Sequence, residues 1–190
     1  SFKSKVDFLI YVDLLSFSFV LLTVTIAFFA YLYAFSYFRY EPHVDRLLIF
    51  LNLFVISMVL LLIAGNFVML FLGWELIGLT SFFLINFWTT RIATLKAAFK
   101  AFLFNRVSDV ALFFLIILSY TLFNSVTHTN VIEFFSDAVY MQNRSSIVCL
   151  NIFVFLIVVP AFIKSEQLFF YIWLPDSMEA PVPASALIHS

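Results

Sequence analysis

The sequence predicts an all-α integral membrane protein with about five transmembrane helices, one of them broken, plus the start of a sixth. Hydrophobic residues make up 64% of the 190 residues and charged residues only 11%, whereas soluble domains carry roughly 25% charged residues. The mean hydropathy of +1.10 agrees with a surface that faces lipid. The net charge of −1 and the lack of a basic patch with interleaved aromatic residues argue against nucleic acid as a partner.

The apolar runs place the spans in chain order. Only Asp13 interrupts the first run, and Gly65 with Asn66 gives the best turn signal between the second and third. A short polar connection at residues 89–96 separates the third run from the fourth. Each run is long enough, at ~1.5 Å of rise per residue, to cross the hydrocarbon core of a bilayer. The first four predicted spans are residues 8–38, 47–65, 67–88 and 97–123.

The fifth predicted span, residues 147–174, is too long for one straight helix. As a single helix it would measure ~42 Å, against a hydrocarbon core of ~30 Å. Polar residues from Lys164 onward interrupt it, and Pro160 removes one backbone hydrogen bond a turn before Lys164. We therefore expect a break here, and such breaks line protein sites rather than lipid. A further helix is expected at residues 183–190, with Pro183 in its first turn.

Residues 124–146 form the one sizeable polar segment of the chain. The spacing of apolar residues at 131–140 predicts an amphipathic helix at the membrane interface. Basic residues are slightly more frequent in the connections after the first and third spans, so the positive-inside rule places those connections on the inner side. We treat residues 1–190 as a single membrane domain that is incomplete without further chains.

Two charged residues stand at membrane depth. Glu75 is ~12 Å from the nearer end of its predicted helix, so its carboxylate cannot easily reach water. A carboxylate there marks a proton or ion path, unless it forms a static ion pair with a basic neighbour. Lys164 could be a surface anchor at the end of its apolar run, but the apolar residues after it favour a place at the helix break. For both residues we favour the functional interpretation.

Other ionisable residues are less informative. Arg106 and Asp109 stand three apart on one helical face and are expected to pair with each other. His189 lies near the start of the last helix, and three roles are equally open for it: a ligand, a proton relay or a residue that only fills space in the packing. His43 and His128 fall in polar loops and are expected to be solvated.

The sequence lacks the parts of a self-contained enzyme. Cys149 is the only cysteine, which excludes an internal disulfide, a cysteine-rich metal site and an iron–sulfur cluster on this chain. We expect Cys149 to serve in packing. Three glycines in the whole chain leave no glycine-rich phosphate loop, and the sequence has no nucleophile elbow and no metal-ligand spacing. The residues able to do chemistry are acids and bases within the membrane.

Four segments, found in order along nearly the whole chain, resemble one known family: residues 73–79, 86–91, 105–109 and 173–189. They closely resemble NADH-ubiquinone oxidoreductase chain 5, the distal antiporter-like subunit of respiratory complex I. The resemblance implies a partial antiporter-like helical bundle, part of an H⁺-translocating NADH:ubiquinone reductase of the mitochondrial inner membrane. It implies no cofactor on this chain, with NAD, FMN, iron–sulfur clusters and ubiquinone bound elsewhere in the complex. The implied partners are the lipid bilayer and other membrane-arm subunits, including a chain that supplies missing helices.

The resemblance also assigns proton translocation to four residues. Glu75 matches the acid of the family's fifth helix, and Lys164 the lysine of its broken seventh helix. His189 matches the histidine of the eighth helix, and Asp109 an acidic position of the sixth.

The chain departs from the family's pattern mainly at the break. Glu166 stands where the family has Ala, Phe169 where it has Pro, and Tyr171 where it has His. Residues 13–16 also differ from the pattern of the third helix. By the same resemblance the chain starts just before the third helix and ends inside the eighth. We therefore expect a fragment, either because the subunit is split between chains or because the sequence is part of a longer one.

Three functions compete. The first is proton translocation within complex I, which the 28 Phe residues, typical of an AT-rich organelle genome, and the motif segments favour. The alternative is a subunit of a related multi-chain sodium/proton antiporter or membrane hydrogenase. The third is a non-pumping scaffold of the membrane arm, against which Glu75 and Lys164 argue because buried charges are costly.

The mechanism that we expect makes Lys164 a switch controlled by Glu75. Desolvation disfavours a lysine ammonium, whereas a carboxylate within ~4–6 Å favours it. Lys164 is therefore expected to keep its proton while Glu75 is close. When Glu75 turns to another base, Lys164 gives the proton up toward His189.

Overall fold

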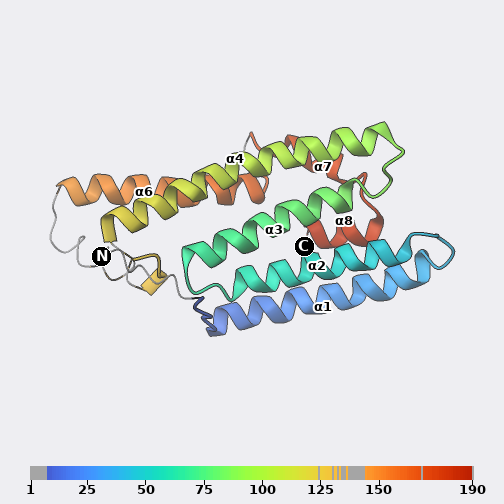
Figure 1. The fold of residues 1–190 in the computed structure, drawn as a ribbon, viewed down its shortest axis with the longest axis horizontal. Coiled ribbons are helices and arrows are strands. Elements are labelled where there is room, and N and C mark those ends of the chain that lie inside the picture. The colour runs from blue at the N-terminus through green and yellow to red at the C-terminus, as the bar shows by residue number, and fades with distance from the viewer. Residues whose placement is uncertain are drawn as a thin grey trace.

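The structure is a computed structural model that describes residues 8–123, 125–129, 131, 133, 136, 144–167 and 169–189. Figure 1 shows an elongated bundle in which α1, α2 and α3 lie side by side, with α4 and α6 beyond α3. The helices are α1 (Leu14–Tyr37), α2 (Val44–Leu62), α3 (Phe67–Ile85), α4 (Ile92–Phe123), α6 (Arg144–Lys164), the 3₁₀ turn η1 (Tyr171–Trp173), α7 (Leu174–Ser177) and α8 (Val182–His189).

The first helix begins later than the sequence predicts, because Asp13 caps it. The Asp13 carboxylate accepts from the Leu14 N–H at 2.6 Å, and the Ser16 hydroxyl oxygen accepts from the Asp13 N–H at 2.7 Å, which completes a capping box. Ile10, ahead of the cap, forms an isolated β-bridge with Ala64. Hydropathy alone placed these apolar residues inside the span, although the polar cap fixes its start.

The predicted turn between the second and third spans is confirmed. The Gly65 N–H donates to the Leu9 carbonyl at 2.8 Å, and a Cβ at Gly65 would lie 2.6 Å from that oxygen, so only glycine fits. Asn66 caps α3, since its side-chain oxygen accepts from the Met69 N–H at 2.7 Å.

The fourth helix is longer than predicted and takes up part of the expected connection at residues 89–96. It has 32 residues and therefore measures ~48 Å, so at least one end extends beyond a ~30 Å hydrocarbon core. The Thr94 hydroxyl in its first turn bonds the carbonyls of Arg91 at 2.7 Å and Trp88 at 2.9 Å, tying the connection to the helix start. Residues 92–96 of this connection thus belong to the helix, and residues 89–91 form the turn before it.

The predicted break of the fifth span is confirmed, and it lies directly after Lys164. Pro160 lies inside α6, and the helix continues for a turn beyond it. The chain then turns through Glu166 at φ 60° and Phe169 at φ 71°, a left-handed conformation that ends the helix. A proline deletes one hydrogen bond, whereas reversing the sign of φ redirects the backbone, so the second effect sets the break.

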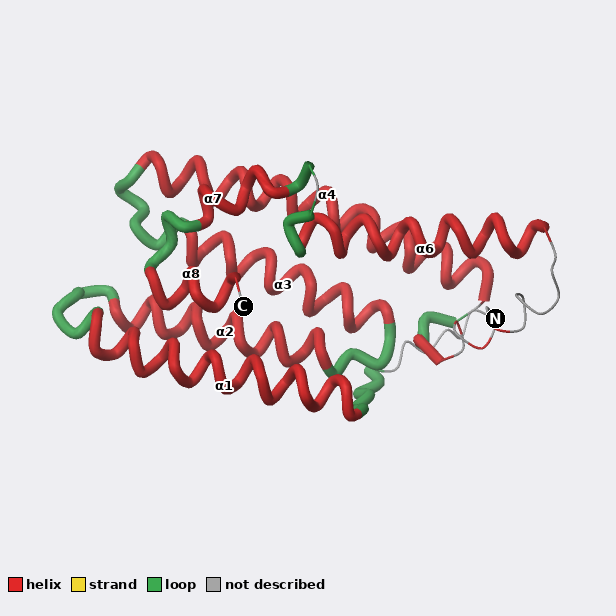
Figure 2. The backbone as a smooth tube through the Cα atoms, turned by 180° about the vertical axis from the view of Figure 1, so that it is seen from behind, coloured by secondary structure: helices red, strands yellow, loops and turns green. Residues whose placement is uncertain are grey.

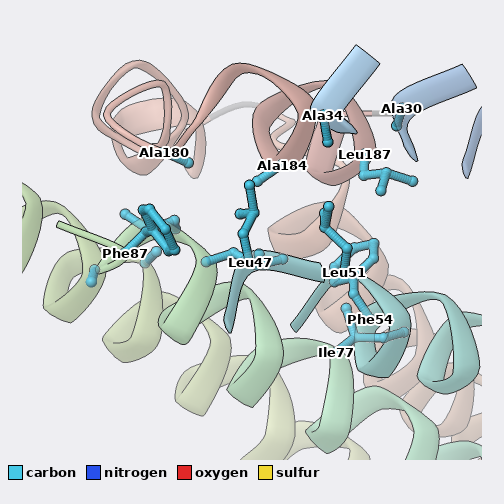
Figure 3. Close-up of a cluster of buried hydrophobic side chains, with 14 of the residues drawn as sticks. Ala30, Ala34, Leu47, Leu51, Phe54, Ile77, Phe87, Ala180, Ala184 and Leu187 are labelled. Carbon is cyan, nitrogen blue, oxygen red and sulfur yellow. The ribbon is translucent and has the colours of Figure 1, made fainter. Parts of the chain in front are cut away.

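The returning segment brings α8 back into the bundle. Figure 2 shows α8 beside α3 and α6 along α4, and α8 also contacts α1. In the core close-up, Ala184 and Leu187 of α8 point toward Leu47 and Leu51 of α2 (Figure 3). Small buried residues on α1, namely Ala27, Ala30 and Ala34, let α8 approach closely.

Among the described residues, the four helices α1 to α4 are long and apolar enough to cross a membrane. The described apolar part of α6, Val148–Lys164, is shorter. Large apolar side chains cover the outside of α1, such as Phe35 at 72% exposure, as expected for contact with lipid. The chain is therefore an all-α membrane protein. Most of the predicted amphipathic helix at 131–140 lies outside the described residues.

Candidate functional site

The centre of the site is an ion pair between neighbouring helices. Glu75 stands midway along α3, and one Arg106 nitrogen on α4, Nη1, contacts both of its carboxylate oxygens, at 2.9 Å for Oε1 and 2.8 Å for Oε2. The predicted contact of Arg106 with Asp109 is present, but at 3.6 Å it is longer. Arg106 is thus the basic neighbour that a static ion pair at Glu75 would need.

Asp109 extends the ion pair into a network. Its side chain is 9% exposed, against 25% for Glu75 and 42% for Arg106. The Ser108 hydroxyl lies 3.3 Å from Asp109 Oδ1, and Trp74 Nε1 donates to the same hydroxyl oxygen at 3.0 Å. Two carboxylates face one guanidinium, so the network favours a further positive charge nearby.

Lys164 supplies that charge from the end of α6. Its Nζ lies 5.4 Å from the centroid of the Trp74 ring, a cation–π distance. Asp109 and Glu75 both act electrostatically on the ammonium. Within the described part of the chain, however, no carboxylate oxygen lies within 4.0 Å of Nζ. Trp74, which sequence analysis did not single out, therefore holds Lys164 beside the two acids.

His189 belongs to a second group on the other side of the break. Its Nδ1 lies 4.0 Å from Glu166 Oε1, and its Nε2 lies 3.3 Å from the hydroxyl of Ser177. In the ranges that the structure describes, no ion pair or hydrogen bond joins Lys164 to His189 directly. The transfer expected between them stays a prediction.

A second interhelical ion pair fixes the segment after the break. Lys100 Nζ on α4 contacts Asp176 Oδ2 on α7 at 2.5 Å, and both side chains are about two-fifths exposed. The residues are 76 positions apart, so no local spacing signals the pair. It joins α7 to α4, the helix that carries Arg106 and Asp109.

The two loop histidines differ in their surroundings. His43 is exposed, as predicted. The prediction for His128 is wrong, because its ring is half-buried and packs edge-on against Phe67, with ring centroids 4.4 Å apart. Burial lowers the pKa of His128, which lies outside the spans. The polarity of the surrounding sequence gave no sign of the apolar contact.

Comparison with known proteins places this arrangement in a family. Residues 64–190, which hold Glu75, Asp109, Lys164 and His189, match the family model described as "NADH:quinone oxidoreductase/Mrp antiporter, TM". The chain belongs to this family. The resemblance seen in the sequence is thereby confirmed, although the match itself assigns no role to any residue.

Individual members of the family are similar over nearly the whole chain. NADH-ubiquinone oxidoreductase chain 5 of Paramecium tetraurelia is 50% identical over 188 residues, 97% of this chain and 33% of that protein. The Acanthamoeba castellanii protein of the same name is 38% identical, over 98% of this chain and 28% of that protein. The chain thus spans about a third of the length of these relatives.

A solved structure also resembles the fold. A chain of the Mrp complex from a Dietzia species superposes with a TM-score of 0.64 at 30% identity. The superposition covers 74% of this chain and 15% of that one.

Within the described residues, no group of three or more His, Cys, Asp or Glu side chains could hold a metal ion.

Proposed function

We propose that this chain is part of a proton-translocating membrane-arm subunit of NADH:ubiquinone oxidoreductase, complex I. The observation that carries the proposal is the meeting of two acids, Glu75 and Asp109, with Lys164 at the end of a broken helix, inside a bundle of membrane spans. Charges at membrane depth are costly and mark ion or proton paths. Family membership supports the same reading.

The geometry suggests how the switch at Lys164 works. Arg106 contacts both oxygens of Glu75, so in this arrangement Glu75 forms its ion pair with Arg106 and none directly with Lys164. The Lys164 ammonium then contacts the face of the Trp74 ring. A ring face stabilises an ammonium, but a nearby carboxylate stabilises it more strongly. If Glu75 moved from Arg106 to Lys164, its charge would stabilise the protonated form of Lys164. Its return to Arg106 would let Lys164 release the proton.

Asp109 and His189 stand on either side of this switch. Asp109 shares the Arg106 guanidinium and the Ser108 hydroxyl, so it can take up the partner that Glu75 leaves. His189 on α8 is the acceptor that we propose beyond the break. The contacts of its ring with Glu166 and Ser177 hold His189 in this position.

The wider setting is also part of the proposal. We infer that the chain lies in the mitochondrial inner membrane with other membrane-arm subunits, one of which supplies further helices. NAD, FMN, iron–sulfur clusters and ubiquinone are expected on other subunits of the complex. The alternative is a subunit of a multi-chain antiporter, which the likeness to the Mrp complex favours. Identifying the chains that co-purify in mild detergent separates the two.

The test of the function is to replace Lys164 by Met and Glu75 by Gln separately and to measure protons pumped per electron in the assembled complex. Both variants should assemble and pump fewer protons per electron. Lys96→Met is the matched control, because Lys96 is exposed at a helix end. If both variants pump at the normal stoichiometry, the charges are structural, as the scaffold hypothesis requires.

A further inference from the structure

One partly buried acid in the helix break, Glu166, takes no part in the proposed switch beyond its contact with His189. Glu166 adopts φ 60°, a left-handed conformation that is uncommon for a residue with a side chain and that glycine adopts more easily. The turn itself therefore does not call for glutamate. Its side chain is nonetheless drawn inward, with 18% of its surface exposed. A carboxylate in that position needs a partner.

The partner on the opposite element is His189. Its Nδ1 lies 4.0 Å from Glu166 Oε1, and within the described ranges Glu166 has no other ion-pair partner. The two residues come from opposite sides of the break, since Glu166 follows α6 and His189 ends α8. The separation is longer than a hydrogen bond but within reach of a small side-chain rotation or one bridging water.

Ser177 determines which ring nitrogen of His189 faces the acid as a base. The Ser177 hydroxyl is fully buried and donates its hydrogen to the Leu174 carbonyl at 2.6 Å. With that hydrogen engaged, its oxygen is an acceptor for His189 Nε2, 3.3 Å away. This contact favours the neutral tautomer with the hydrogen on Nε2, in which Nδ1 presents a lone pair toward Glu166.

A ring lone pair and a carboxylate that face each other at this distance repel, and one proton placed between them removes the repulsion. One proton on the pair gives either a carboxylic acid beside a neutral imidazole or a carboxylate beside an imidazolium. Both side chains are partly buried, so desolvation penalises the separated charges and the neutral arrangement is favoured. We propose that Glu166 and His189 share one proton, held at rest on Glu166 as a carboxylic acid, and that Ser177 sets the tautomer that allows it.

The pair gives the proposed function a proton acceptor beyond Lys164. The Lys164 ammonium loses one proton and becomes an amine, and the pair gains that proton and becomes a carboxylic acid beside an imidazolium. The imidazolium then passes one proton onward, which restores the resting pair. This use of the pair rests on the proposed function, whereas the shared proton itself does not.

The test compares Glu166→Gln and Ser177→Ala with the control Glu179→Gln in the assembled complex. Glu179 is an exposed acid of the same segment. Infrared difference spectroscopy reads the carboxylic-acid C=O band directly. We expect Glu166→Gln to remove one such band, Ser177→Ala to shift it, and Glu179→Gln to leave it unchanged. Glu166→Gln should also lower the protons pumped per electron to the level of Lys164→Met.

The outcomes separate this inference from the proposed function. One outcome is that Glu166→Gln loses the band and Ser177→Ala shifts it, while Glu166→Gln and Lys164→Met both pump normally. This result would support the shared proton and contradict the proposed function. No band assignable to Glu166, with pumping lost only in Lys164→Met, would overturn the inference and leave the function intact. If Glu166→Gln does not assemble, Glu166→Asp keeps the acid on a shorter side chain and should shift the band; an unshifted band would also overturn the inference.

Discussion

At the scale of single residues, the two cations of the site differ in what they can do with a proton. An arginine guanidinium stays protonated in proteins, whereas a lysine ammonium can lose its proton when desolvated. Arg106, which bridges both oxygens of Glu75, can therefore hold the acid but cannot carry protons. Lys164, which rests on the Trp74 ring, can do so. In the proposed switch, Glu75 moves between a cation that stays protonated, Arg106, and one that can release its proton, Lys164.

The first prediction concerns that choice. Replacing Arg106 by Gln frees Glu75 to pair with Lys164, so Lys164 should hold its proton more tightly. A gain of ~1.4 kcal/mol for that pair would slow proton release about tenfold. We expect slower, incomplete pumping in the assembled complex, and a smaller loss for Arg106→Lys, which keeps the charge. Arg91→Gln is the control, because Arg91 is exposed and stacks on Trp88. Normal pumping in Arg106→Gln would make the ion pair purely structural.

The second prediction concerns pH at His128. Its pKa is lowered by burial, so the opened state binds a proton more readily than the packed one. The packing of His128 on Phe67 is therefore fully stable above the ordinary histidine value of ~6.5 and is weakened as the pH falls below it. Amide hydrogen exchange of residues 125–129, corrected for intrinsic rates, should show lower protection at acid pH. His128→Phe should abolish this dependence, and His43→Phe, at an exposed site, should not.

At the scale of the helices, local signals were predictable from the sequence and contacts between helices were not. The turn at Gly65 and Asn66 and the break near Lys164 were found because glycine, polar residues and excess length act within one segment. Glu75 and Arg106 are 31 positions apart, and no periodicity relates them. Ionisable residues could be chosen as candidates from their depth, but which acid meets which base depends on how helices pack.

The third prediction tests the packing that sets these contacts. A Cβ at Gly73 of α3 would lie 2.9 Å from the backbone of Leu61 on α2, so the two helices would have to separate. We expect Gly73→Ala to destabilise the assembled complex by about 1–3 kcal/mol, as overpacking does. A Cβ at Gly78 would meet Asn105 at 3.7 Å, an ordinary contact. Gly78→Ala should therefore be neutral or stabilising by up to ~1 kcal/mol in thermal unfolding. An equal loss in both variants would contradict this account.

At the scale of the whole molecule, two ends of the bundle are defined by contacts. At one end, Asn66 before α3 pairs with Thr127 after α4 in an isolated β-bridge. At the other, Arg46 near the start of α2 donates to the carbonyl of Phe87 after α3, at 2.9 Å. Figure 1 shows the connections α1–α2 and α3–α4 together at this second end. The bundle thus has the alternating connections that a multi-span membrane protein needs.

The last prediction is the orientation of those ends. Cys149 is the only cysteine, so Cys149→Ser gives a background in which single reporters can be placed. Tyr40 and Thr90 are exposed at one end and Thr129 at the other. Cysteines at Tyr40 and Thr90 should react with a membrane-impermeant reagent from the inner side of the membrane, because basic residues favour that side. A cysteine at Thr129 should react only from the opposite side.

Two different failures are possible in this labelling experiment, and they have different meanings. If Tyr40→Cys and Thr129→Cys react from the same side, an odd number of spans does not separate them and the arrangement of α1 to α4 across the membrane is wrong. If they react from opposite sides but with the inner and outer sides exchanged, the arrangement of α1 to α4 is correct and the charge-based orientation is wrong. The opposite sides of Tyr40 and Thr129 follow from the three helices between them, α2, α3 and α4. Which of the two sides is the inner one follows only from the slight excess of basic residues beside the spans.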